Sequence, residues 1–292
     1  MRVLDNYFFD DRFSNIAKGK TAFCIFGGPS VKNVDNIDYL IENNFTVTVN
    51  KNIVSYPNVD MYVTADNMLT RLYFEKDDFF LHKFRNGKMM RTRAMLDYDL
   101  EPTWFKSERF VIEKNKNLLK IIGCNTFPCY NNNFTTGQTY YLDGIKFAKQ
   151  TKNTYICIEH RDETSGESYP VLTLGDQSTV FSYGKNPKNL ISGGNISSIV
   201  FQLLKYMGFS KIIVIGYGDI GTSNGYENSM FEWTDEELHA MSVHSHIWGE
   251  NFKILSGGEL LDKYGFVHGK ADISEMENKN DKKELINKFK SL

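Results

Sequence analysis

Two glycine-rich turns each adjoin an apolar run, and either could hold the phosphate of a nucleotide. The first is Gly27-Gly28-Pro29-Ser30, which directly follows the apolar run 21–26. Its glycines let the backbone approach a ligand, the proline restricts φ, and the serine can cap the next helix or bind a phosphate. The tetrapeptide alone fits two interpretations equally: a nucleotide-binding turn, or an ordinary strand-to-helix turn with a serine N-cap.

The second turn, Ser192-Gly193-Gly194, precedes a predicted apolar helix. The free N–H groups and the positive dipole end of such a helix suit an anionic oxygen. The next predicted strand, 211–215, runs into a further glycine-rich end that carries the acid Asp219. Two such strand ends together indicate a site more strongly than either does alone.

The elements that would position these turns follow from the hydrophobic pattern. Strand, helix and strand alternate at the spacing of an α/β fold, so we predict a Rossmann-like parallel sheet flanked by helices in a single domain, 1–292. Within it, about 70–188 is predicted to contain a divergent insertion or lid that forms an acceptor subdomain. The charged C-terminal segment 270–292 predicts a solvated helix or a frayed tail. The predicted strands are 21–26, 45–50, 61–64, 109–112, 154–158 and 211–215, and the predicted helices are 36–43 and 196–207.

Composition excludes several classes of protein. The chain has 292 residues, of which 41% are hydrophobic, and this composition is typical of a folded globular protein and not of a disordered one. It has 34 Lys+Arg against 36 Asp+Glu, a balance that is not typical of a protein that coats a polyanion. Its four cysteines are too few for a disulfide scaffold and lack the spacing of structural zinc sites. We find neither a signal-peptide pattern nor a long apolar span, so the sequence predicts a soluble, cytoplasmic protein with no transmembrane segment.

As a set, these motifs resemble the bacterial sialyltransferases of glycosyltransferase family 42. They are also similar to the related motility accessory factors and archaeal pterin-diphosphokinase-like proteins. The resemblance covers roughly 20–70 and 188–260. It rests on G-G-P-S, on Asn50 and Asp66 after two predicted strands, and on the block I-S-G-G-N followed by G-Y-G-D and N-G-Y.

The resemblance implies a GT-A-like variant of the Rossmann fold that binds a nucleotide-activated, CMP-linked sugar and transfers the sugar to a hydroxyl acceptor. Because these sialyltransferases use no metal, we expect a metal-independent reaction with no cofactor beyond the nucleotide sugar; Asp97 and Asp99 lie away from any predicted strand end. The donor-binding residues that it implies are Gly27, Gly28, Pro29, Ser30, Asn50, Ser192, Gly193, Gly194, Asp219 and Tyr226.

Two alternatives stay open at this point. The related archaeal proteins imply a diphosphokinase that acts on a pterin-like alcohol with ATP and Mg²⁺. The histidine that the sialyltransferases carry shortly before the position of Thr234 is replaced here by the stretch 227–233, E-N-S-M-F-E-W. A nucleotide-binding module without catalysis is therefore the second alternative.

The transfer needs a general base that accepts the acceptor proton. His239, on a helix predicted to begin near 234–235, is one candidate, and Glu232 with its neighbour Glu227 is another. Asp66 and Asp219 are further candidates. For each of them the alternative is a surface or capping role. His246 lies two helical turns from His239, which is too far for one shared metal ion.

A basic run occupies 82–96, where no acid interrupts the positive charges until position 97. Such a run is either a solvated face or a binding surface for an anionic acceptor, which would be a glycan, a lipid surface or nucleic acid. Lys88, Arg91 and Arg93 are the residues that we assign to acceptor binding.

Overall fold

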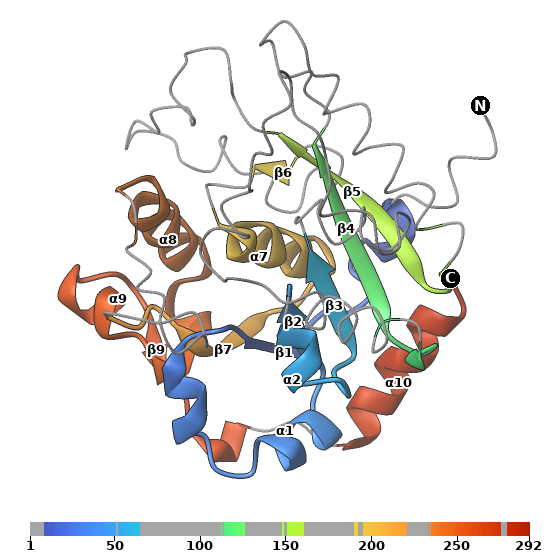
Figure 1. Ribbon diagram of the computed structural model, residues 1–292, viewed down its shortest axis with the longest axis horizontal. Coiled ribbons are helices and arrows are strands. Elements are labelled where there is room, and N and C mark those ends of the chain that lie inside the picture. The colour runs from blue at the N-terminus through green and yellow to red at the C-terminus, as the bar shows by residue number, and fades with distance from the viewer. Residues whose placement is uncertain are drawn as a thin grey trace, which may run out of the picture.

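The computed structural model describes residues 9–50, 52–64, 112, 114–125, 148, 151–160, 190–191, 195–220, 233, 235–275 and 279–292. In these residues one sheet of nine strands runs in the order β6-β5-β4-β3-β2-β1-β7-β8-β9, and every neighbouring pair is parallel. Helices cover both faces of the sheet (Figure 1). The predicted α/β, Rossmann-like fold is confirmed.

The strands are β1 (Thr21–Ile25), β2 (Thr46–Val49), β3 (Met61–Thr64), β4 (Leu119–Asn125), β5 (Thr154–His160), β6 (Leu190–Ile191), β7 (Lys211–Tyr217), β8 (Phe252–Gly257) and β9 (Gly269–Lys270). The α-helices are α1 (Ile37–Asn43), α2 (Asn52–Ser55), α7 (Ile196–Tyr206), α8 (Asp235–Trp248), α9 (Glu259–Lys263) and α10 (Lys279–Lys290). Short 3-10 helices lie at Asp11–Phe13, Pro29–Asn33, Gly249–Asn251 and Ile273–Glu275.

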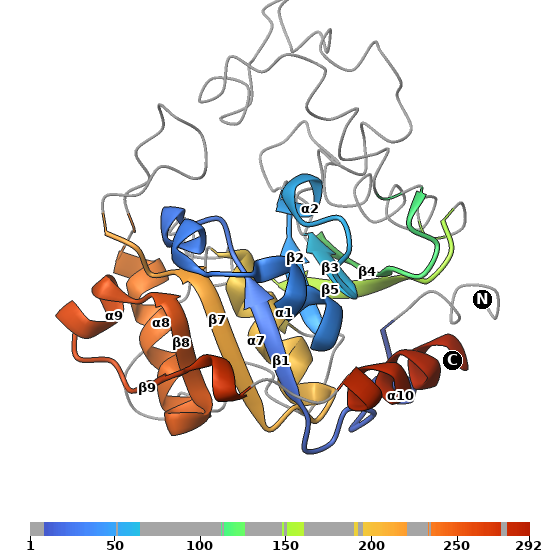
Figure 2. The same ribbon diagram turned by 90° about the horizontal axis from the view of Figure 1, so that it is seen from below.

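Alternate side chains of the central strands build two cores. On β1, Cys24 belongs to the core that α7, α8 and α10 cover, whereas Phe23 and Ile25 belong to the core that α1 covers. Figure 2 shows α7 and α8 on one side of the strands and α1 on the other. Strands that are buried on both faces must be apolar at nearly every position, which explains the continuous apolar run 21–26.

Strand β4 differs from the prediction. Of the strand predicted over 109–112, the structure describes only Ile112, which is helical, and the strand lies further along the chain at β4. Lys120 interrupts the apolar pattern of β4, but it is buried and donates to the carbonyls of Leu118 (3.0 Å) and Lys152 (2.8 Å). Burial lowers the pKa of Lys120 to about 8. The strand was therefore not predicted, because a lysine that is buried and bonded to backbone oxygens is indistinguishable in the sequence from an exposed one.

The predicted insertion, about 70–188, contributes β4 and β5 to the central sheet. The C-terminal segment forms α10, which buries Leu285 against the core, so it is not a frayed tail. Among the residues that the structure describes, no helix has both the length and the apolar character needed to cross a membrane.

Candidate functional site

The sheet changes direction at β1. The chain adds β2 to β6 on one side of β1 and then returns through α7 to place β7 on the other side. Strand β1 pairs in register with β7, with Ile25 opposite Ile215. The two glycine-rich ends, after β1 and at β7, are thus neighbours at the topological switch point, outside whose carboxyl strand ends open α/β sheets bind ligands.

Hydrogen bonds between Ser30 and Asp219 join these two strand ends. Ser30 donates to Asp219 Oδ2 from its hydroxyl at 2.9 Å and from its backbone N–H at 3.3 Å. Both residues are buried, with 8% and 4% of their surface exposed. Asp219 Oδ1 is buried too, and no described residue donates to it. Ser30 is not the N-cap of the following turn, because Gly28 occupies that position.

Gly28 fits only because it has no side chain. A Cβ at this position would overlap Asp219 Oδ2 and would lie 2.6 Å from the carbonyl oxygen of Gly216. Gly257, at the end of β8, has φ +90, and a Cβ there would lie 2.7 Å from Asp219 Oδ1. Three strand ends therefore converge on one carboxylate. Gly27 is different, because a Cβ there would meet only the side chain of Asn52, at 3.3 Å.

The residues that follow β2 add amide groups to the same edge of the sheet, and the last residue of β3 adds a hydroxyl group. Asn50 adopts a left-handed conformation with φ 45, and its Oδ1 accepts a hydrogen bond of 2.9 Å from Thr64 Oγ1. Asn52 places its side chain beside Gly27. Asn52 was not predicted as a site residue, although its position two residues after the end of the predicted strand 45–50 was the signal that could have found it.

A second group of side chains surrounds Tyr217, between the end of β7 and the start of α7. Ser197 Oγ donates to the Tyr217 hydroxyl at 3.3 Å, and Trp233 Nε1 donates to the carbonyl of Asp219 at 3.4 Å. Burial raises the pKa of Tyr217; the Ser197 hydrogen bond opposes this, and the charge of Glu237 adds to it. Tyr217, Ser197 and Glu237 are buried site residues that the sequence analysis did not single out.

The N-terminus of α7 is well formed. Asn195 is its N-cap, and the Asn195 side chain accepts a hydrogen bond of 2.9 Å from the N–H of Ser197. The bond from Ser197 to Tyr217 ties this turn to the end of β7. The positive end of the α7 dipole is therefore directed toward the switch-point edge.

The three histidines of α8 have different environments. The helix begins at Asp235, which confirms the predicted start near 234–235. His239 is half-buried, its Nε2 has no partner among the described residues, and burial lowers its pKa. His244 is fully buried against the ring of Phe201, and burial lowers its pKa to about 3. His246 is exposed. Burial favours the neutral form of both His239 and His244, and of the two only His239 is half-buried as a residue, although its Nε2 atom is itself buried.

Several predicted site residues lie outside the described residues, so their positions stay predictions. They are the base candidates Asp66, Glu227 and Glu232, the donor residues Ser192, Gly193, Gly194 and Tyr226, the acceptor residues Lys88, Arg91 and Arg93, and the pair Asp97 and Asp99.

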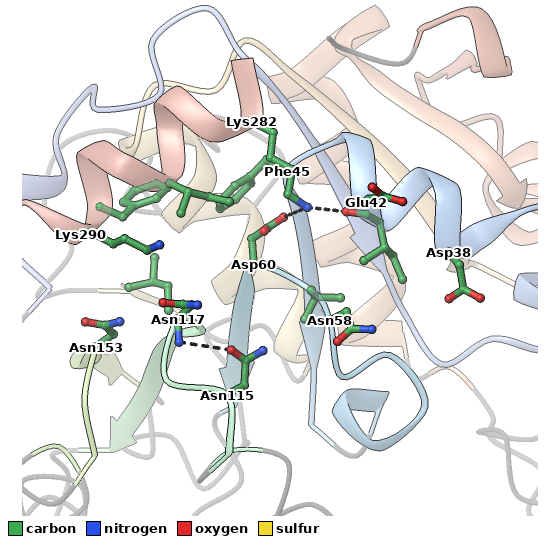
Figure 3. A pocket seen from close by; sticks show the side chains of 15 residues that line it. Asp38, Glu42, Phe45, Asn58, Asp60, Asn115, Asn117, Asn153, Lys282 and Lys290 are labelled. Atoms are coloured by element: carbon green, nitrogen blue, oxygen red, sulfur yellow. Dashed lines mark hydrogen bonds and ion pairs between the residues drawn. The ribbon is translucent and has the colours of Figure 1, made fainter. Parts of the chain in front are cut away.

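A cavity of about 680 Å³ lies at the opposite, amino edge of the sheet. It is open to solvent and is lined by α1, by α10, by the residues that precede β2, β3, β4 and β5, and by the first residue of β4 (Figure 3). None of the predicted site residues lines it. Within the described part of the chain, no group of three His, Cys, Asp or Glu side chains is arranged to hold a metal ion.

We compared the chain with protein-family models, with curated proteins and with solved structures, and none of them matched it.

Proposed function

We propose that the chain is a glycosyltransferase that binds a nucleotide-activated, CMP-linked sugar at the switch-point edge and transfers the sugar to a hydroxyl acceptor. The observation that supports the proposal most is the placement of the turn after β1 beside the end of β7, where Gly28 packs against a buried carboxylate. At Gly27, where a Cβ would meet only the side chain of Asn52, a ligand phosphate can approach the backbone of this turn closely. The CMP-linked sugar donor and its transfer to a hydroxyl group are inferred from the resemblance to the sialyltransferases.

The proposed reaction is a direct displacement at the anomeric carbon. The acceptor oxygen forms a bond to that carbon, the bond from the carbon to the phosphate oxygen breaks, and CMP leaves with the electron pair. Negative charge grows on the departing phosphate in the transition state. The positive end of the α7 dipole, beside Tyr217, is placed to stabilise that charge.

His239 is the described residue that we propose as the base. It must be neutral in order to accept the acceptor proton, and burial favours the neutral form by lowering its pKa. Its Nε2 is buried and has no hydrogen-bond partner among the described residues, so the acceptor must reach this nitrogen for the proton to be transferred. Glu232 and Asp66 stay alternative bases.

Metal-free thermal shifts with CMP, CDP, UDP, GDP and ATP test the binding step, because a nucleotide that binds the folded chain raises its Tm. We expect the largest shift with CMP and the same shift in EDTA. Release of CMP from a CMP-sugar in the presence of a hydroxyl acceptor then tests transfer. If none of the nucleotides raises Tm, the proposal is wrong.

The same panel separates the alternatives. A shift with ATP that requires Mg²⁺ would indicate diphosphoryl transfer to an alcohol. A shift with CMP without turnover of any CMP-sugar would indicate a nucleotide-binding module. His239→Gln should reduce turnover and leave the CMP shift unchanged, because it removes the proton acceptor and keeps a similar side-chain volume.

A further inference from the structure

The cavity at the amino edge has a buried ion pair in its wall. Lys282 Nζ on α10 lies 2.9 Å from Asp60 Oδ2, with 10% and 8% of the two side chains exposed (Figure 3). Lys282 also donates to the carbonyl of Ile41. The same Asp60 oxygen accepts from the N–H of Thr46 at 2.9 Å and from its hydroxyl at 3.1 Å. The pair therefore joins α10 to the first residue of β2 and to the residue that precedes β3.

Only one oxygen of Asp60 takes part in these bonds. Oδ2 receives all three donors, whereas Oδ1 accepts from no described residue. Burial raises the pKa of Asp60, and Lys282 and Thr46 oppose this. Because the carboxylate is held rigidly and lines the cavity, Oδ1 is a fixed acceptor for a ligand donor.

The amide groups of the cavity fall into two sets. Asn115 and Asn153 are structural: their Nδ2 atoms donate to the carbonyls of Pro57 (3.0 Å) and Lys116 (2.8 Å). Asn58 and Asn117 are exposed, and their side chains make no hydrogen bond with a described residue. Each free amide offers two N–H donors and one acceptor oxygen, the combination that matches the hydroxyl groups of a polyol.

The remaining wall is apolar and contains aromatic rings. Phe289 and Ile286 of α10 are half-buried, and the fully buried ring of Phe45 packs against that of Phe289 with the ring centroids 5.5 Å apart. Such a surface suits the C–H face of a sugar ring. The charges disfavour a phosphate, because three of the described lining residues, Asp38, Glu42 and Asp60, are carboxylates and only two, Lys282 and Lys290, are cations.

From this arrangement we propose that the amino-edge cavity binds a neutral mono- or disaccharide. Asp60 Oδ1 and the amides of Asn58 and Asn117 would bind its hydroxyl groups, and the side chains of Phe289 and Ile286 would pack against the ring. A volume of about 680 Å³ falls within the roughly 300–1,000 Å³ of small-molecule sites. The proposal is independent of the nucleotide site, which lies at the other edge of the sheet and shares no residue with this cavity.

Saturation-transfer NMR on the full chain tests the proposal, with maltose, cellobiose, lactose and chitobiose as probes. We expect saturation transfer to at least one of these sugars. The double variant Asn58→Ala/Asn117→Ala should weaken that binding about tenfold or more, because two hydrogen bonds are lost. Asn287→Ala is the matched control: Asn287 is an exposed asparagine of α10 that does not line the cavity, so binding should not change.

Three results would overturn the proposal. In the first, none of the sugars receives saturation. In the second, the double variant binds the sugar as tightly as the unmodified chain. In the third, inorganic phosphate, spermidine or CMP displaces the sugar, which would indicate an anion site, a cation site or the switch-point edge respectively. The CMP thermal shift, measured on the same double variant, should be unchanged, so failure of the nucleotide proposal can be distinguished from failure of this one.

Discussion

The two edges of the sheet each hold a buried carboxylate, and they stabilise it by different means. At the carboxyl edge, Asp219 is held by the neutral donors of Ser30, and Gly28 and Gly257 leave the room that it needs. At the amino edge, Asp60 is paired with a cation, Lys282, which a helix distant in sequence supplies. The arrangement at the carboxyl edge requires glycines, which have no side chain, whereas the arrangement at the amino edge requires an opposite charge.

The comparison shows what each edge can offer a ligand. The carboxyl edge brings glycine backbone and a helix dipole together, which favours an anion, whereas the carboxylate of Asp219 opposes one. The amino edge pairs Asp60 with Lys282 and presents exposed amides beside the half-buried ring of Phe289, which suits a neutral polar molecule. Substitutions at matched positions on the two edges test this difference.

The largest effect is expected at the carboxyl edge. Gly28→Ala should lower the free energy of unfolding by about 3 kcal/mol, because the new Cβ overlaps Asp219 and the carbonyl of Gly216. Gly27→Ala is the control, since only the flexible side chain of Asn52 must move, and it should cost much less. Urea denaturation measures both. Equal costs for the two variants would contradict the steric account.

At the amino edge, Lys282→Met should destabilise the fold by about 2 kcal/mol because it leaves the charge of Asp60 uncompensated. This is less than the roughly 3–5 kcal/mol of fully enclosed pairs, since the cavity gives water access to Asp60. Adding Asp60→Asn to Lys282→Met should recover most of the loss. If the double variant is less stable than Lys282→Met, compensation of the Asp60 charge does not explain the stability that Lys282 contributes.

Helix α8 runs from the carboxyl edge to the amino edge, and its His244 predicts an acid-sensitive fold. The pKa of His244 is about 3 in the folded chain against 6.5 ordinarily, so below pH 6.5 the unfolded chain binds a proton that the folded chain does not. The free energy of unfolding should therefore decrease as the pH is lowered, by about 2 kcal/mol between pH 6.5 and about pH 5. His244→Phe should flatten the pH dependence of urea denaturation over this range, and an unchanged slope would reject the assignment.

The smallest effect compares two hydroxyl groups. Ser30→Ala removes the shorter of the two bonds to Asp219 Oδ2 and should cost about 1.5 kcal/mol, together with a smaller CMP thermal shift. Thr46→Val removes the equivalent bond to Asp60, where Lys282 still compensates the charge, and should cost about 1 kcal/mol. Urea denaturation of both variants shows which one loses more free energy of unfolding. A larger loss for Thr46→Val would contradict the proposed difference between the edges.

Local patterns predicted much of the fold. The apolar runs at 21–26, 45–50, 61–64, 154–158 and 211–215 correspond to β1, β2, β3, β5 and β7. Strand β4 was missed because Lys120 interrupts its pattern, and the carbonyls that bind its ammonium group come from Leu118 and from Lys152, on the neighbouring chain segment. Among the site residues, Glu237 and Tyr217 were missed because burial, which no local pattern shows, is what makes them distinctive.

By itself the sequence determined which segments are buried strands and where glycines end them, because those properties depend on neighbouring residues. Only the tertiary structure decided which strand ends are neighbours. Ser30 and Asp219 are 189 positions apart, and they meet because β7 returns to pair with β1. The pair of Asp60 and Lys282 likewise requires α10 to pack across the amino edge. Both contacts depend on the order of strands in the sheet, which long-range packing selects.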